Sequence, residues 1–172
     1  KLGKNFEYIP APLDSKKFKD IPDTEKKKQI VFVGRDSFEK GIDILQKIEP
    51  KINAQVKYCT NLAWSDAMKI VKESEILFVP SRTESIPQVI KEAFYLKVPV
   101  VATNVGGIPE LVHDNSTGLL VTSENYEEMI STINTLLDDD DKKKELAKNA
   151  FDFINKNFSW DVLIEKYIKL YR

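Results

Sequence analysis

Short apolar runs and amphipathic segments alternate along the middle of the chain. The runs are rich in Val, Ile, Leu and aromatic residues, as in strands buried on both faces, and lie at residues 30–34, 55–59, 76–79, 98–102 and 118–121. Between them, helical spacing of apolar residues predicts helices over 40–49, 64–73 and 87–97 and, after residue 121, helices to the end of the chain with breaks near Asp138 and Phe158. Strands that alternate with helices are typical of a parallel sheet covered on both sides, so we expect an α/β, doubly wound, Rossmann-like domain.

The two ends of the chain depart from this pattern. Residues 1–29 are polar and carry several prolines, which favours a linker between domains, with one short strand at residues 6–9. We therefore place the α/β domain at residues 30–157 and a C-terminal helix at residues 158–172. That helix carries an apolar stripe made of Trp160, Leu163, Tyr167 and Leu170. We interpret the stripe as core packing, with docking onto a further domain as the alternative.

Length, charge and cysteine content narrow the function classes. A chain of 172 residues can bury one sizeable core. Lys and Arg total 26 and Asp and Glu total 27, and the resulting net charge of −1 argues against a nucleic-acid partner, which would require a basic excess.

The single cysteine, Cys59, excludes a disulfide within the chain and suits a reducing, cytoplasmic compartment; we expect it to be a buried side chain and not a nucleophile. No apolar stretch approaches the ~18 residues of a membrane span, and the start without Met indicates a piece of a longer protein.

The loop after the first predicted strand carries two cations. In sheets of this kind ligands bind beyond the carboxyl ends of the strands, and residues 34–41 place Arg35 and Lys40 at such an end. Two fixed cations can neutralise a diphosphate without a metal, because the guanidinium fork suits phosphate oxygens and the ammonium adds a point charge. The alternative is that both are surface cations paired with Asp36 and Glu39.

The loop after residue 79 carries Glu84 and runs into a helix that contains Glu92. Free backbone N–H groups at the start of a helix can bind an anion, and the helix dipole favours it. Two carboxylates are poor phosphate ligands but good acceptors for sugar hydroxyls, here at opposite ends of one long ligand. The alternative is that Glu84 caps the helix and Glu92 pairs with a lysine.

Together these segments resemble the C-terminal domain of GT-B-fold glycosyltransferases, in the large retaining group often called group 1 or family 4. Residues 33–41 are similar to its phosphate-binding loop, in which Gly-Arg and Lys-Gly are separated by four residues. Residues 84–93 are similar to its signature of two glutamates separated by seven residues, and residues 99–110 and 117–121 to the segments that follow. Each motif is weak alone, but their order and spacing are specific, and the resemblance covers roughly residues 6–172.

The resemblance implies a role for each matching residue. Arg35 and Lys40 would hold the donor diphosphate and stabilise the leaving nucleotide. Glu84 would act at the reacting centre by contacting a hydroxyl of the donor sugar, and Glu92 would bind the ribose hydroxyls. The start of the helix would present backbone N–H groups to the sugar or the distal phosphate, namely those of Ile86, Gln88 and Val89.

The resemblance also implies what the full-length enzyme would require. Its substrate would be a nucleotide-sugar, transferred with retention, and neither a cofactor nor a metal would be needed. The acceptor would bind an N-terminal domain that this chain lacks, so the chain alone would be inactive, and a peripheral contact of the whole enzyme with a membrane stays open. The stretch that bridges the first helix and the strand at 76–79 is short, residues 52–62. We expect that one β–α unit of the family is missing there, and the identity of the base, the sugar and the acceptor stays open.

Other functions fit the same fold class. A nucleotide-sugar epimerase would share the fold and would need catalytic carboxylates and a histidine in the partner domain. A binding module without catalysis would not need to keep Arg35, Lys40, Glu84 and Glu92. A dinucleotide-binding domain would need Gly-x-Gly-x-x-Gly after the first strand, which residues 34–39 lack.

Overall fold

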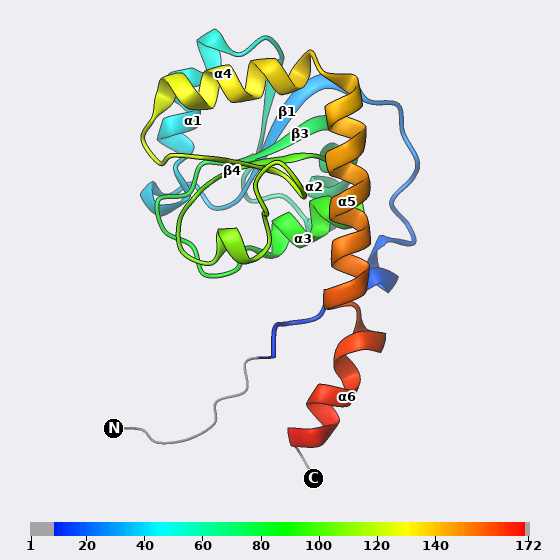
Figure 1. Cartoon of the computed structure of the whole chain (residues 1–172). Helices are drawn as coiled ribbons and strands as arrows, with labels where there is room; N and C mark the ends of the chain where they lie inside the picture. The colour runs from blue at the N-terminus through cyan, green and yellow to red at the C-terminus, as the bar shows by residue number, and fades with distance from the viewer. Residues whose placement is uncertain (1–8, 171–172) are drawn as a thin grey trace, which may run out of the picture.

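The first strand of the described residues lies inside the sheet, between the second and the third. The computed structural model describes residues 9–170, and its parallel sheet has five strands in the order β2-β1-β3-β4-β5 (Figure 1). The strands are β1 (Lys27–Val33), β2 (Gln55–Cys59), β3 (Ser74–Val79), β4 (Val100–Thr103) and β5 (Leu119–Val121). Because β2 lies on one side of β1 and β3 on the other, the strand order reverses there, which places a ligand crevice at the carboxyl ends of β1 and β3.

Helices cover both faces of the sheet, so the predicted α/β, doubly wound fold class is confirmed. They are α1 (Ile42–Ile48), α2 (Trp64–Glu73), α3 (Gln88–Tyr95), α4 (Tyr126–Leu137), α5 (Asp140–Phe158) and α6 (Trp160–Leu170). Short 3-10 turns lie at η1 (Ser15–Phe18), η2 (Phe38–Lys40), η3 (Glu49–Lys51) and η4 (Ile108–Glu110). Apolar residues of α1 and α4 pack on one face, and those of α2, α3 and most of α5 on the other (Figure 1).

The strands alternate between two cores, which explains their continuous apolar sequences. In β3, Ile76 and Phe78 belong to the core under α1 and α4, whereas Leu77 and Val79 belong to the core under α2 and α3. A strand with a core on each side has no polar face, unlike a strand at a wetted surface. The central strands are therefore held firmly, and the loops at their carboxyl ends start from fixed positions.

The predicted linker is partly packed against the domain. β1 begins at Lys27, within residues 1–29, and Leu13 and Phe18 are buried in the core under α2 and α3. The Phe18 ring packs edge-on against Trp64, with ring centroids 5.1 Å apart. The predicted strand at residues 6–9 lies almost entirely outside the described residues.

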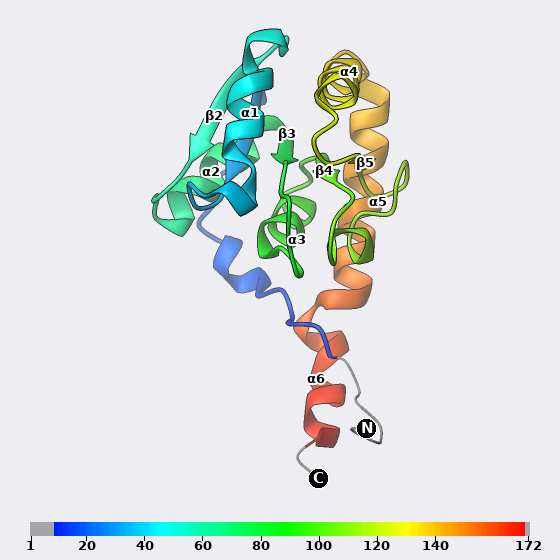
Figure 2. The ribbon, with the colours of Figure 1, turned by 90° about the vertical axis from the view of Figure 1, so that its left-hand side faces the viewer.

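The prediction that the apolar stripe of the C-terminal helix packs in the core is wrong for Trp160 and Leu170. Leu163 is buried, but Trp160 and Leu170 expose 46% and 57% of their surface. Both views show α6 extending away from the sheet, beside the segment near residue 10, where the Tyr167 hydroxyl donates to the Pro10 carbonyl at 3.3 Å (Figures 1 and 2). Within residues 9–170, no helix is both long enough and apolar enough to cross a membrane.

Candidate functional site

The turn after β1 is packed directly against the loop after β3. The turn is η2 (Phe38–Lys40), and it ends at Gly41, whose φ of 70° is left-handed. A Cβ at this position would lie 2.0 Å from the Pro80 carbonyl oxygen, so only glycine permits the contact. The two loops at the switch point therefore meet backbone to backbone, and Lys40 is delivered to the edge of the loop that carries Glu84.

Lys40 and Glu84 form an ion pair between these two loops. Their side chains keep 26% and 11% of their exposure, so the pair is partly shielded from solvent. The structure thus joins two residues predicted for different parts of one ligand. It contradicts the alternative in which Lys40 pairs with Glu39 and the one in which Glu84 caps the helix, because α3 has no side-chain cap.

A third loop closes over the backbone at Glu84. Gly106 is left-handed, with φ of 54°, and a Cβ there would lie 1.8 Å from the Glu84 carbonyl oxygen. The neighbouring Gly107 donates its N–H to that same oxygen at 3.2 Å. β4 and β1 lie on opposite sides of β3. The loop after β4 therefore holds the Glu84 backbone from the side opposite the turn that carries Lys40, and both glycines permit the close approach of main chain to main chain.

The start of α3 presents free backbone donors beside this ion pair. The helix begins at Gln88, one residue later than predicted, with Pro87 as its N-cap. Among the described residues, no protein acceptor takes the N–H groups of Gln88 and Val89. Ile86, also predicted to contribute its N–H, precedes the helix and packs its half-buried side chain on the core, and its N–H likewise has no protein acceptor within the described range. Unpaired N–H groups at a helix start favour an anion.

Arg35 and Glu92 line one hollow at the carboxyl ends of β1 and β2. The hollow measures about 370 Å³, and Gly34, Cys59 and Trp64 also line it. Gly34 joins the hollow to the ion pair, because a Cβ built there would lie 3.8 Å from Cδ of Lys40. Arg35 is exposed and forms no ion pair with any residue in the described range, which contradicts its pairing with Asp36.

Glu92 accepts a hydrogen bond from the Trp64 indole, with Nε1 2.8 Å from Oε1. This partner contradicts the alternative in which Glu92 pairs with a lysine. Burial raises the pKa of Glu92 above its ordinary value, and the bond from Trp64 opposes that rise. The indole therefore orients a carboxylate that would otherwise be poorly solvated in the wall of the hollow.

Cys59 lies in the wall of this hollow but lacks the properties of a nucleophile. The side chain is buried, as predicted. Burial raises the pKa of its thiol to about 11, so the thiolate is scarce at neutral pH. Within residues 9–170, no group of three or more His, Cys, Asp or Glu side chains is arranged to hold a metal ion.

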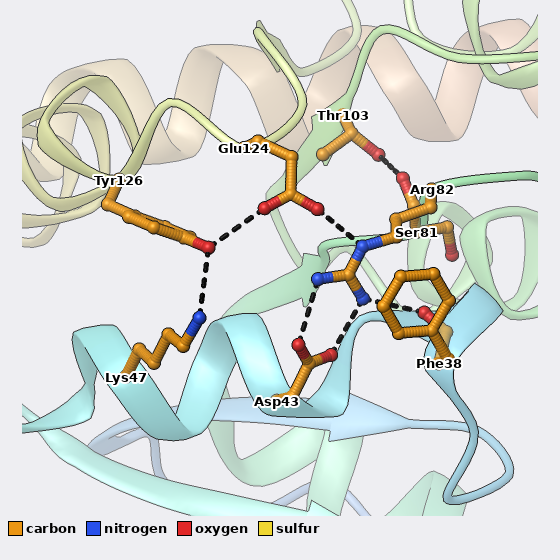
Figure 3. A network of polar contacts seen from close by, with 8 residues as sticks. All are labelled: Phe38, Asp43, Lys47, Ser81, Arg82, Thr103, Glu124 and Tyr126. Carbon is orange, nitrogen blue, oxygen red and sulfur yellow. Dashed lines mark hydrogen bonds and ion pairs between the residues drawn. The ribbon is translucent and has the colours of Figure 1, made fainter.

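Arg82, which the sequence did not single out, is the most heavily bonded side chain of the site (Figure 3). Its fork binds Asp43 at 2.7 and 2.8 Å, and it also donates to the Phe38 carbonyl at 2.7 Å. Its Nε pairs with Glu124, from the loop before α4. A lone arginine beside Thr83 has no spacing signature, and its carboxylate partners lie 39 and 42 residues away along the chain, so no local signal could reveal the network.

Comparison with known proteins connects this geometry to one family. A family model described as "Glycosyl transferases group 1" matches residues 46–153. D-inositol 3-phosphate glycosyltransferase of Corynebacterium efficiens is 31% identical over 124 residues, which are 72% of this chain and 29% of that protein. Sucrose-phosphate synthase from Thermosynechococcus elongatus superposes with a TM-score of 0.81 at 21% identity, over 95% of this chain and 51% of its own. Anabaena HepE in complex with UDP-glucose gives a TM-score of 0.75 at 21% identity, over 84% and 48%. The chain spans about half, or less, of the length of these proteins.

Proposed function

The chain belongs to the glycosyl transferases of group 1, and from this premise we propose that it binds the nucleotide-sugar donor of a longer enzyme that transfers a hexosyl group with retention. The observation that carries the proposal is the pairing of Lys40 with Glu84 across the switch point, beside a hollow lined by Arg35 and Glu92. One crevice then offers cations for a diphosphate and carboxylates for hydroxyls on either side. HepE, a relative in fold, was solved with UDP-glucose, which has this chemistry.

The diphosphate would occupy the junction between the ion pair and the hollow. The guanidinium of Arg35 has no ion-pair partner there within residues 9–170, and the stem of Lys40 passes close to Gly34 in the wall of the hollow. The N–H groups of Gln88 and Val89, for which the described part of the chain offers no acceptor, add partial positive charge. As the bond to the sugar breaks, negative charge grows on the departing nucleoside diphosphate, and these groups would stabilise it without a metal or another cofactor.

The two carboxylates would read opposite ends of the donor. Glu92 has one oxygen bound to Trp64, which leaves the other for the paired hydroxyls of a ribose inside the hollow. Glu84 pairs with Lys40 and does not line the hollow, and the sugar would follow the distal phosphate toward it. Its carboxylate would accept a bond from a sugar hydroxyl and stabilise the positive charge that develops as the sugar becomes oxocarbenium-like.

The acceptor would be bound by a second domain of the full-length protein. The chain covers 29% of the D-inositol 3-phosphate glycosyltransferase and 51% of the sucrose-phosphate synthase chain, which leaves room for such a domain. The exposed Trp160 on α6 is a surface against which that domain would pack. We place the enzyme in the cytoplasm, where nucleotide-sugars are used by soluble or membrane-bound transferases, and expect the isolated chain to bind donor without transferring sugar.

A fluorescence titration tests donor binding. The chain has two tryptophans, and Trp160→Phe leaves only Trp64, which lines the hollow. UDP, GDP and ADP are added separately in the presence of EDTA, and at least one should change the Trp64 emission to saturation. NAD is the control for a dinucleotide-binding domain. If none of the diphosphates binds, or if NAD binds better than all of them, the proposal is wrong. With full-length protein, release of epimerised sugar without transfer would favour the epimerase alternative.

A further inference from the structure

We propose that Arg82 is a positioning residue that fixes the turn carrying Lys40, and thereby sets where the Lys40 ammonium meets the donor diphosphate. The inference rests on the proposed function for its ligand, but the positioning itself is a property of the free protein. Arg82 lies in the loop after β3 and does not line the hollow. Its effect on the ligand would therefore pass through the turn and not through direct contact.

The contacts of Arg82 converge on one segment of chain, residues 38–43. The guanidinium donates to the carbonyl of Phe38 and to both carboxylate oxygens of Asp43, which flank the turn on either side. The backbone N–H of Arg82 donates to the Glu39 carbonyl at 2.8 Å. The Phe38 ring also lies over the guanidinium, 3.8 Å from ring centroid to Cζ. Main chain and side chain of Arg82 together hold the segment on both sides of Lys40, at Phe38 and Glu39 before it and at Asp43 after it.

Apart from Arg82, the Gly41 contact with Pro80 and the Lys40–Glu84 ion pair, the turn is held mainly by its own backbone hydrogen bonds. It contains one 3-10 turn, closed by the bonds from Lys40 N–H to Ser37 and from Gly41 N–H to Phe38, each 3.1 Å long. Ser37 provides no side-chain cap, and its buried hydroxyl has no hydrogen-bond partner in the described structure. Phe38 exposes 67% of its surface, so it adds little burial apart from its contact with Arg82. A short turn of this kind is marginal alone, and the arginine supplies the order.

The chemistry of the contact requires a guanidinium. Arg82 keeps only 13% of its side-chain exposure, and its bond to Asp43 lowers the pKa of that carboxyl and so favours the ionised pair. A planar fork can bind both oxygens of Asp43 while a third N–H reaches Phe38, and a lysine ammonium cannot match this geometry. Charge alone should therefore not replace Arg82.

Glu124 provides a matched control within the same network. It pairs with Nε of Arg82 but belongs to the loop after β5, and within residues 9–170 no hydrogen bond or ion pair joins it to residues 38–43 (Figure 3). Asp43 and Glu124 are thus two carboxylates on one arginine, of which only Asp43 holds the Lys40 segment. Replacing either by the corresponding amide keeps size and removes the charge.

The experiment compares Arg82→Lys, Asp43→Asn and Glu124→Gln in two measurements on the same preparations. The first is NMR amide hydrogen exchange at Lys40 and Gly41, read without ligand. The second is the affinity for UDP, read by calorimetry, with the melting temperature recorded for each variant. We expect Arg82→Lys and Asp43→Asn to speed exchange at both amides and to weaken UDP about tenfold, and Glu124→Gln to change each by less than about twofold.

A second comparison shows whether Arg82 acts through Lys40. In a Lys40→Ala background the ammonium is gone, so adding Arg82→Lys should cause no further loss of UDP affinity. Undiminished loss in that background, unchanged exchange at Lys40 and Gly41, or equal effects of Glu124→Gln and Asp43→Asn would each overturn the proposal. Failure of the unchanged protein to bind UDP would count against the proposed function alone, because the exchange measurement decides the positioning without ligand.

Discussion

Lys40 and Glu84 lie 44 residues apart in the chain and form an ion pair across the two loops that meet at the switch point. A diphosphate that reaches Lys40 must therefore share its ammonium with a carboxylate already in place. Electrostatic competition of this kind lowers the affinity for an anion while it keeps both groups ordered for the step that needs them. The pair would thus limit the affinity for the proposed donor, an effect that can be measured.

Glu84→Gln should remove this competition without changing the size of the side chain. We expect the affinity for UDP to stay the same or to rise by up to about tenfold, and the transfer rate of the full-length enzyme to fall by more than about tenfold, because the developing positive charge on the sugar loses its partner. Calorimetry and initial rates separate the two effects. The control is Glu39→Gln, an exposed carboxylate in the neighbouring turn. A loss of UDP affinity as large as that of Lys40→Ala would show that Glu84 orients Lys40 and does not compete for it.

Arg35→Ala and Lys40→Ala should each weaken UDP by about ten- to a hundredfold. The estimate follows from roughly 1.5–3 kcal/mol for each hydrogen bond to a charged group. Arg35 is exposed, so removing it should change the melting temperature little, whereas Lys40→Ala leaves the shielded Glu84 without its partner and should lower the melting temperature. Calorimetry with and without EDTA is the measurement, and EDTA should have no effect. Binding that depends on a divalent metal and ignores both substitutions would refute the assignment of the diphosphate to these cations.

Glu92→Gln should make the free protein more stable at neutral pH while it weakens UDP. Burial raises the pKa of Glu92 above its ordinary value of 4.5 in the folded state. A group with a raised pKa contributes stability that is fully present below its unfolded pKa and is lost as the pH rises through its folded pKa. Glutamine keeps an acceptor for Trp64 and does not titrate, so the advantage of the variant should grow from pH 4.5 toward pH 7 and vanish below.

The measurement for Glu92 is the melting temperature between pH 4 and pH 8. Glu165→Gln, on the exposed face of α6, is the control carboxylate and should not show the trend. A variant less stable than the parent at pH 7 would mean that the ionised carboxylate supports the fold more than its burial opposes it. Unchanged affinity for UDP would separately remove Glu92 from the ribose site.

The strands were predictable because local sequence and burial agree in them, whereas the contacts between loops were not. A strand such as β3 lies between two cores, so nearly every side chain is apolar and the run is visible in the sequence. The Lys40–Glu84 pair depends on how closely Gly41 approaches Pro80, a tertiary property that no periodicity encodes. The exposure of Trp160 was missed for a related reason, since an apolar stripe on a helix looks the same whether it faces a core or a further domain.

Residue types suggested the chemistry of the site but not how its groups are oriented. A pair of glutamates separated by seven residues pointed to Glu84 and Glu92. Their actual partners, Lys40 and Trp64, belong to loops and helices that follow other strands. The donor of the bond to Glu92 was visible in the sequence only as one more apolar residue on the buried side of a helix.

Trp64→Phe should weaken UDP by about three- to tenfold through Glu92 and not through the ring itself. Phenylalanine preserves the aromatic contact with Phe18 but removes the N–H that holds Oε1 of Glu92. Without that bond the buried carboxylate has no fixed orientation, and part of the roughly 1.5–3 kcal/mol of a charged hydrogen bond to the ribose would be lost. Calorimetry replaces fluorescence here, and Trp160→Phe, the same substitution on exposed α6, should leave the affinity unchanged.

A double-mutant cycle with Glu92→Ala separates the two routes, because a tryptophan that acts only by orienting Glu92 has no effect once that carboxylate is gone. If Trp64→Phe weakens UDP equally in both backgrounds, the indole contacts the nucleotide directly, and its bond to Glu92 is incidental to binding.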